Sequence, residues 1–504
     1  MKTHTDTDLC IVGGAGAGLC AAVRAAQCGV KHILVLDKQP KMGGCTRMAQ
    51  GMFSCESPVQ KRNGDQMLSA DECFHYHMDM TNWEPDGKLV RKWLTTTGKV
   101  VGWLEDYVGV EFIQAAPWST GLPAYHMTAK PTGNEIVNHL LAKCRALGVE
   151  LVTNARARHL LQKDGAVIGV QAEKDGEEWE IHAKRVILAT GSISANQELI
   201  QRFYGRDNDM SHVRIMANVP HNTGDGLLMA EELGAANTPI ASLFIGPHNH
   251  PYNPRTGLLI RRPHVVKVNR DGERFTNEDQ IITRRWGWTL AVSLDRQPEK
   301  KCFALMDASM LRYFLEHKQN YYPLEMIHGT GHTNIKDDYG KDEAKSLDWN
   351  NPTKWLDHIV EDIEAEIAGG RIAKCGSYAE MAQVIGCTPQ KIEETISNYN
   401  RYCAQGYDEE FLKEPEYLFP LTEFPIYVMK AYQGIDTPIG GIRINHEQKI
   451  VNKELYPIPN LYGAGIMTGG WLGRNYGFFG SEMSYVTYSG YAAGEHAAKE
   501  ILGE

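Results

Sequence analysis

Residues 8–18 read Asp-Leu-Cys-Ile-Val-Gly-Gly-Ala-Gly-Ala-Gly, so a short apolar run ends directly in a cluster of glycines. Small, helix-forming residues continue over 17–28, and a second apolar run, Ile-Leu-Val-Leu-Asp, occupies residues 33–37. This order predicts a strand, a helix and a second strand, which implies a parallel pair joined by a right-handed crossover. The opening of the chain therefore favours the α/β class.

The glycine cluster predicts a dinucleotide site. Glycines there let the chain turn sharply, let the backbone approach a pyrophosphate and let the helix pack on the strand. The helix N-terminus offers N–H groups and partial positive charge to the phosphates, and Asp37 stands where an acid takes ribose hydroxyls. Ala15 stands at the position of the second glycine of the G-x-G-x-x-G pattern, so its methyl group narrows the space through which a phosphate approaches the backbone. The alternative is a helix-packing turn without a ligand.

Both ends of the chain hold further segments rich in small residues. Near the start these are residues 41–46 and 49–52, and near the end residues 462–465, 468–470 and 480–481. Small residues let the backbone lie flat against a planar ring. A helix N-terminus beside the N1–C2=O edge of a flavin would stabilise its anionic reduced form. We interpret the two ends as the two halves of one flavin site.

Length and composition set limits on the class of protein. The 504 residues exceed what one hydrophobic core usually serves, so we expect two lobes or more. A net charge of −10 argues against a nucleic-acid partner. No apolar run is long enough to predict a membrane span, and no secretory signal is visible. The 11 cysteines include no Cys-x-x-Cys pair, which predicts no metal site and free thiols in a reducing, cytoplasmic compartment.

The pattern of elements suggests an interrupted parent domain. Helices are expected at 134–147, 355–368, 389–404 and 481–501, and a strand at 460–465. Residues 150–152, 165–172 and 178–182 are interpreted as strands of a small sheet, and 185–190 as another buried strand. Between residues 242 and 432, Pro, Asn, His and Trp become frequent, which suggests an inserted lobe. We therefore expect three segments: a dinucleotide-binding domain over 1–241, a capping or substrate domain over 242–432, and the completion of the first domain over 433–504.

These stretches resemble the fumarate reductase/succinate dehydrogenase flavoprotein family, whose soluble members include flavocytochrome fumarate reductases, urocanate reductases and 3-ketosteroid dehydrogenases. The matching segments occur in the family's order and span nearly the whole chain: Ile11–Ala22, Lys38–Gly51, Val186–Asn196, His221–Ala236, Gly272–Glu278 and Ile458–Gly473. The resemblance implies an interrupted Rossmann-type FAD-binding domain with an inserted α+β capping domain. It also implies that the substrate lies between the cap and the isoalloxazine ring.

The glycine turns and the resemblance together assign a set of residues to FAD. They are Gly13, Gly14, Ala15, Gly16, Ala17, Gly18, Asp37, Lys38, Gly43, Gly44, Cys45, Thr46, Ala49, Gly51, Met52, Ala157, Ala189, Thr190, Gly191, Asn196, Asp225, Gly465, Gly480, Ser481 and Met483. Cys45 stands where the membrane-bound branch carries a His bonded covalently to FAD, whereas soluble relatives have a small polar residue there. We expect non-covalent FAD; the alternatives for Cys45 are a cysteinyl–flavin bond and a packed thiol. Ile466 replaces an acid that in the family touches the ribityl chain.

The family's catalytic residues carry over only in part. Fumarate reductases in the family use an Arg as acid, fed by a Glu and a second Arg, and clamp carboxylates with His and Arg. The resemblance places His250 at the substrate, Arg261 at the relay Arg, and Arg284 at the acid if the chain has a small insertion, with Arg285 as the other candidate. Leu258 stands where the relay Glu belongs. Each of these arginines has the alternative of a surface or interlobe ion pair, and His250 that of a loop polar group.

A tyrosine replaces the carboxylate-clamping Arg near the end of the chain. This is Tyr476, with Arg474 two residues earlier, and the residues 436–437 replace the family's late His. These losses argue against fumarate as the substrate. A Tyr at this position resembles the ketosteroid branch of the family, in which tyrosines bind or protonate around a carbonyl. A phenol can donate a hydrogen bond to a carbonyl and can act as an acid or a base. Which of Tyr476, Arg284 and Arg285 gives the proton is left open. The aromatic residues around Tyr476 predict a pocket for a ring-bearing carbonyl compound, or else the core beneath the last helix: Trp471, Phe478, Phe479 and Tyr485.

The favoured function is an FAD-dependent oxidoreductase acting on an activated C–C bond. It would reduce an enoate or enone, or run the reverse dehydrogenation, by hydride transfer at flavin N5. No second nucleotide fingerprint is present, so a separate electron donor or acceptor is expected. The alternatives are an amino-acid or hydroxy-acid oxidase of the L-aspartate oxidase type, and a flavoprotein subunit of a larger electron-transfer complex.

Overall fold

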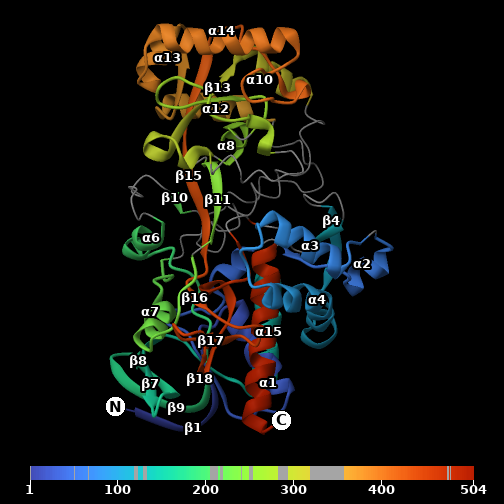
Figure 1. Ribbon diagram of the computed structural model, residues 1–504, viewed down its shortest axis with the longest axis vertical. Helices are drawn as coiled ribbons and strands as arrows, with labels where there is room; N and C mark the ends of the chain where they lie inside the picture. The colour runs from blue at the N-terminus through green and yellow to red at the C-terminus, as the bar shows by residue number, and fades with distance from the viewer. Residues whose placement is uncertain are drawn as a thin grey trace. The chain divides into compact units, whose positions relative to one another are not determined.

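The chain divides into two units in a computed structural model (Figure 1). The first comprises Met1–Asn208, Ala217–Leu243 and Thr437–Glu504, and the second comprises Asp209–Met216 and Phe244–Asp436. The residues that the structure describes are 2–49, 51–65, 67–117, 123–128, 133–204, 214–215, 220–239, 241–248, 254–260, 262–281, 293–317, 357–473, 476, 478 and 480–504.

The first unit is built on a mostly parallel sheet. Six of its eight strands lie in the order β17 (Lys449–Val451), β18 (Pro457–Gly463), β9 (Glu177–Leu188), β1 (Lys2–Val12), β2 (Ile33–Leu36) and β6 (Glu150–Val152). Neighbours in this row of six are parallel except β17, which is antiparallel to β18. Val12 pairs with both Leu36 and Leu188, and Leu188 pairs with Gly463. The carboxyl ends of four strands are therefore aligned at one edge of the sheet.

Two helices from opposite ends of the chain cover this sheet. Helix α1 (Gly16–Gln27) and helix α15 (Ser481–Leu502) lie side by side in Figure 1. A Cβ on Gly490 would lie 2.2 Å from the carbonyl oxygen of Ala17, and a Cβ on Gly494 would lie 2.4 Å from that of Ala21. The close approach of the two backbones therefore leaves room only for glycine at positions 490 and 494.

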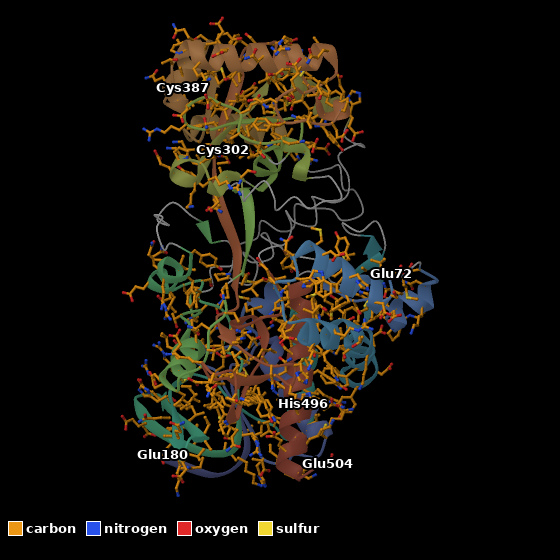
Figure 2. All side chains as sticks on the ribbon, viewed as in Figure 1. Glu72, Glu180, Cys302, Cys387, His496 and Glu504 are labelled. Atoms are coloured by element: carbon orange, nitrogen blue, oxygen red, sulfur yellow. The ribbon has the colours of Figure 1, made fainter. Side chains whose placement is uncertain are left out.

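Shorter elements complete the first unit. The helical part has α2 (Pro58–Asn63), α3 (Ala70–Met80), α4 (Gly87–Trp103), α5 (Gly133–Ala146), α6 (Gln197–Tyr204) and α7 (Asp225–Glu232). Strands β3 (Met52–Phe53), β5 (Pro123–Thr128) and β4 (Phe112–Pro117) form a three-stranded sheet. Helix α3 begins at a capping box in which Ser69 and Glu72 bond each other's backbone N–H groups; Glu72 is labelled in Figure 2.

The second unit is α+β. Its sheet is centred on β15 (Ile426–Ile439), which is antiparallel to β13 (Lys301–Asp307) and to β14 (Ile372–Cys375). The other strands and α-helices described with residues in this unit are β10 (Arg214–Ile215), β11 (Ala241–His248), α8 (Pro254–Ile260), β12 (Val266–Val268), α10 (Ala308–Glu316), α12 (Ile359–Ala368), α13 (Tyr378–Ile385) and α14 (Pro389–Gln405). The core is apolar and includes Cys302, labelled in Figure 2.

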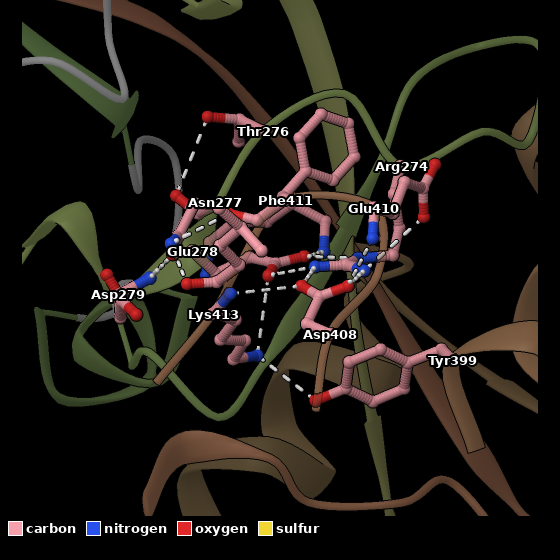
Figure 3. A network of polar contacts seen from close by, with 12 residues as sticks. Arg274, Thr276, Asn277, Glu278, Asp279, Tyr399, Asp408, Glu410, Phe411 and Lys413 are labelled. Atoms are coloured by element: carbon pink, nitrogen blue, oxygen red, sulfur yellow. Dashed lines mark hydrogen bonds and ion pairs between the residues drawn. The ribbon is translucent and has the colours of Figure 1, made fainter. Parts of the chain in front are cut away.

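A buried ionic network fixes the segment 274–279 of the second unit (Figure 3). The Nη2 of Arg274 lies 2.9 Å from Glu278 Oε2 and 2.8 Å from Asp408 Oδ2. Lys413 Nζ lies 3.4 Å from the same Glu278 oxygen and donates to the Tyr399 hydroxyl at 3.1 Å. Burial opposes ionisation of Glu278, yet the charges of Arg274 and Lys413 lower its pKa to about 2. The contacts with Arg274 and Lys413 thus hold Glu278 as a carboxylate.

The structure corrects three strand predictions. Residues 178–182 and 185–190 do not form two strands, because β9 runs unbroken from Glu177 to Leu188 and leaves an antiparallel ladder with β8 (Ala166–Lys174) to enter the parallel sheet. Residues 150–152 do not belong to that small ladder, because β6 pairs with β2. The ladder's other strand, β7 (Ala155–Lys163), was not expected, since it is rich in charged and polar residues. No helix of the described residues is long and apolar enough for a membrane span.

Candidate functional site

The predicted cofactor residues lie at the aligned strand ends. Residues 13–18 follow β1, Asp37 follows β2, residues 189–191 follow β9, and Gly465 lies two residues after β18. Because these strands are parallel and in register, the four segments meet at the carboxyl edge of the sheet. This edge is where open α/β sheets bind ligands.

The turn after β1 is tightly constrained. Gly13 has a φ of +112°, and a Cβ there would lie 2.2 Å from the Ala189 carbonyl oxygen, so the segment after β9 packs directly on it. Gly16 N–H donates to Thr46 Oγ1 at 3.0 Å, which ties the start of α1 to the 3-10 helix η1 (Gly44–Met48). A Cβ on Gly16 would also lie 2.9 Å from Val486 Cγ1 of α15. The turn therefore touches both other glycine-rich parts of the sequence.

Asp37 fastens the glycine turn to the end of β2. Its Oδ2 accepts the N–H of Gly14 at 2.9 Å, and its Oδ1 accepts the N–H of Gln39 at 2.8 Å. Burial raises the pKa of this carboxyl, although both N–H donors oppose the rise. Each carboxylate oxygen can accept a second hydrogen bond, so the position fits the recognition of ribose hydroxyls.

A polar cluster braces the same edge. The carboxylate of Asp225, in the first turn of α7, lies 2.9 Å from Lys38 Nζ and 3.1 Å from Arg156 Nη2, and Thr223 Oγ1 donates to it at 2.7 Å. Burial opposes ionisation, but the bonds from Lys38, Thr223 and Arg156 lower the pKa of Asp225. Asp225 therefore braces α7 against Lys38 after β2 and Arg156 in β7.

Cys45 has a partner that sequence reasoning did not identify. Asn222 Nδ2 donates to Cys45 Sγ at 3.0 Å and lies 3.4 Å from Ser192 Oγ. This contact favours the alternative that Cys45 is a packed thiol. The non-covalent attachment of FAD stays a prediction.

The remaining predicted cofactor residues lie in β7, in the segment after β9 and near the start of α15. Ala157 lies in β7, whose first residue, Ala155, donates its N–H to the Asp37 carbonyl. Thr190 N–H and Oγ1 both donate to Met467 Sδ at 3.4 Å, and Asn196 Oδ1 accepts the N–H of Leu199 in α6. Phe53 donates its N–H to the Gly480 carbonyl at 3.1 Å, so the 49–52 segment meets the start of α15, which carries Ser481 and Met483. The structure thus brings the two ends of the chain together.

The comparisons agree with this geometry. A family model described as an FAD binding domain matches residues 8–478. The chain belongs to this FAD-binding family. The vinyl phenol reductase of Lactiplantibacillus plantarum is 27% identical over 516 residues, covering 99% of this chain and 98% of that protein.

Two solved structures are similar in fold. A flavocytochrome c3 fumarate reductase in its open conformation gives a TM-score of 0.70 at 24% identity, covering 99% of this chain and 79% of that one. The 3-ketosteroid-delta4-(5alpha)-dehydrogenase from Rhodococcus jostii RHA1 gives a TM-score of 0.70 at 20% identity, and the match covers 99% of this chain and 100% of that one. These findings confirm the predicted family resemblance, the FAD cofactor, the oxidoreductase class and the Rossmann-type fold with an α+β cap.

The residues at the sheet edge fit FAD. The glycine turn supplies the close backbone approach that a pyrophosphate needs, and the N-termini of α1 and α15 face the same edge. Asp37, which bonds the glycine turn at the end of β2, fits the ribose. The contact of each named residue with FAD stays a prediction.

Most predicted catalytic residues fall outside the described part of the chain. These are His250, Arg261, Arg284, Arg285 and Arg474, and Phe479 falls outside it as well. Tyr476 is described: it is 5% exposed, and its hydroxyl oxygen accepts the N–H of Glu482 at 3.0 Å. The backbone N–H comes from the first turn of α15. The phenol oxygen therefore lies at the positive end of a 22-residue helix.

The aromatic residues around Tyr476 are packed together. The Trp471 and Tyr485 rings stack with centroids 4.0 Å apart, and the Phe478 and Phe53 rings stack at 4.2 Å. Trp471, Phe478 and Tyr485 are at most 1% exposed, which supports the alternative that they are core. Phe53, Trp93 and His77 also belong to this cluster, and sequence reasoning missed them.

Proposed function

We propose that the chain reduces an activated C=C bond, or runs the reverse dehydrogenation, on a substrate other than fumarate. The likeness to a protein named vinyl phenol reductase supports a ring-bearing substrate. When bound, FAD supplies hydride transfer at N5. The chain's own residues then have to hold the substrate and deliver a proton to the other carbon.

The placement of Tyr476 supports this proposal most directly. A phenol that gives up its proton leaves negative charge on its oxygen, and at Tyr476 that oxygen accepts the Glu482 N–H. An N–H donor and a helix N-terminus both stabilise negative charge. We therefore assign the proton to Tyr476 Oη, with Arg284 and Arg285 as the other candidates from the sequence.

The electrons require a second molecule. The sequence holds one dinucleotide fingerprint, so we propose a separate electron donor or acceptor. All 11 cysteines are free thiols, which supports a reducing, cytoplasmic compartment. We further propose that the second unit is the cap that binds the substrate, and that residues 242–432 correspond to it.

Anaerobic reoxidation tests the proposed reaction. The bound FAD is reduced with light, and vinyl phenols, enones, enoates and fumarate are each added while the flavin absorbance is followed. We expect rapid reoxidation by at least one ring-bearing alkene or enone and slow reoxidation by fumarate. Fast reoxidation by fumarate alone would contradict the proposal, and peroxide release with an amino acid in air would favour the oxidase alternative.

A further inference from the structure

The loop that carries Tyr476 joins β19 (Thr468–Gly469) to α15. Two described aromatic residues flank the tyrosine: Trp471 precedes it by five positions, and Phe478 follows it by two. Both are buried. The orientation of the phenol therefore depends on what holds Trp471 and Phe478.

His77 of α3 contacts both flanks of the loop. Its Nε2 lies 3.0 Å from the Trp471 carbonyl oxygen, and its ring is nearly parallel to that of Phe478, at 18° with centroids 6.0 Å apart. A carbonyl oxygen only accepts, so Nε2 carries the proton and donates it. One helical turn further along the chain, Thr81 packs on the loop so closely that a Cβ on Gly473 would lie 2.7 Å from its Cβ.

Trp93 of α4 supports His77 from the side. Its ring meets the edge of His77 at 5.4 Å and that of Trp471 at 5.4 Å, in T-shaped pairs of 86° and 78°. Its Nε1 donates to Ser484 Oγ at 2.9 Å in the first turn of α15. His77 and Trp93 thus connect two helices to both sides of the loop and to the helix start that holds the Tyr476 oxygen.

The presence of an imidazole here is informative. A fully buried imidazole loses its hydration, whereas an apolar ring would fill the space without that cost. Within the described residues, Nδ1 has no hydrogen-bond partner. The hydrogen bond to the Trp471 carbonyl is therefore what an imidazole adds over an apolar ring at this place. This bond fixes the position of the loop in a way that packing alone would not.

We propose that His77 and Trp93 are positioning residues that hold the loop so that Tyr476 Oη is aligned for proton delivery. The inference rests on the proposed role of Tyr476. Loss of alignment slows turnover strongly, because a displacement near 1 Å costs about 100-fold in rate when the group transfers a proton or other reacting atom. Substrate binding and FAD binding are expected to change little.

Single substitutions separate the hydrogen bond from the packing. His77→Phe keeps a ring but removes the donor, and Trp93→Phe keeps a ring but removes the bond to Ser484. Each removes only one of the contacts that hold the loop, so each is expected to lower kcat about tenfold, less than the roughly 100-fold cost of a full 1 Å displacement. The KM, the FAD content and the visible spectrum are expected to stay unchanged. His77→Gln keeps an N–H donor and is expected to recover part of the loss. The matched control is Trp103→Phe on the same helix, whose Nε1 donates to Gln27 Oε1 at 2.9 Å away from the loop, and it is expected to leave kcat unchanged.

A double-substitution cycle with Tyr476→Phe decides the proposal. If His77 acts through Tyr476, His77→Phe lowers kcat less than twofold once Tyr476 is Phe; we expect this non-additive result. Equal losses in both backgrounds would overturn the positioning role while leaving the proton donor in place. A Tyr476→Phe single variant with unchanged kcat would instead overturn the proposed function of Tyr476. If His77→Phe lacks FAD or melts early, the same cycle is run with Trp93→Phe.

Discussion

Gly490 in the last helix lies against Ala17 in the first, with room for no side chain: a Cβ on Gly490 would sit 2.2 Å from the Ala17 carbonyl oxygen. Ala17 belongs to the glycine turn, and Gly490 lies less than three helical turns after Gly480. The opening and the end of the chain therefore form one continuous structure at the carboxyl edge of the sheet.

Enlarging Gly490 is expected to damage this structure. The contact atom is backbone, so Gly490→Ala has to push α15 away from α1, at a cost of about 1–3 kcal/mol. The melting temperature and the FAD content of the purified protein measure the effect, and both should fall. Gly87→Ala is the control, because its Cβ would meet Phe74 at an ordinary 3.8 Å. Equal stability of the two variants would show that the helices do not pack as described.

Asp37→Asn is expected to weaken FAD binding about tenfold or more. The NH₂ group of the amide would face one of the two backbone N–H donors, so one hydrogen bond to the carboxylate is lost. Hydrogen bonds to a charged group are worth about 1.5–3 kcal/mol. Titration of the deflavinated protein with FAD, followed by flavin fluorescence, gives the Kd. Asp71→Asn, at an exposed ion pair with Arg91, should leave the Kd unchanged. An unchanged Kd in Asp37→Asn would remove Asp37 from the cofactor site.

Tyr476→Phe is expected to lower kcat about 100-fold while FAD remains bound. General acids contribute roughly 10²–10⁴ to rate, and the phenol oxygen is the group placed on the Glu482 N–H. Steady-state turnover with the substrate found by reoxidation measures the change. A kcat equal to that of the wild type would show that Tyr476 is not the proton donor and would leave Arg284 and Arg285 as the candidates.

Strong local patterns made much of this fold predictable. The glycine turn, the first β-α-β unit and the last helix all follow from short-range sequence signals, and α15 indeed runs over Ser481–Leu502. The sequence predicts two strands, 178–182 and 185–190, where β9 is continuous, because Lys184 interrupts the apolar pattern between them. Asp37 was predictable because it is the acidic residue at the end of the second strand of a β-α-β unit, where dinucleotide-binding folds place the acid that binds the ribose.

Contacts between distant parts of the chain were not predictable. His77 and Trp471 are 394 residues apart, and Trp93 and Ser484 are 391 apart. No local periodicity marks either His77 or Trp93 as part of a site, because each lies on an ordinary amphipathic helix face. Only the fold brings them to the loop of Tyr476.

The buried network of the second unit is expected to govern its stability. Asp408→Asn leaves Arg274 without one of its two fully buried carboxylates, and breaking a buried pair costs about 3–5 kcal/mol. Hydrogen exchange of the second unit, or its proteolysis, should accelerate markedly. Glu409→Gln, one residue along, removes only a surface pair with Arg401 and should cost less than about 1 kcal/mol. Similar protection in both variants would refute a stabilising role for the network.

Stability is expected to decline as the pH falls from about 6.5 towards 4. Burial lowers the pKa of His77 and of His126 to about 4, whereas unfolded His titrates near 6.5. The unfolded chain therefore binds more protons in this window, so the stabilisation is complete above pH 6.5 and is lost as the pH approaches 4. His126→Gln should flatten the dependence of melting temperature on pH between 7 and 5. An equally steep profile in this variant would show that His126 titrates normally in the folded state.

The joining of the two chain ends into one FAD site is tested most directly by the flavin spectrum of the purified protein. The account predicts a yellow protein that releases FAD on denaturation, and a deflavinated form that rebinds FAD with a higher melting temperature. A colourless protein whose melting temperature is indifferent to added FAD would contradict it.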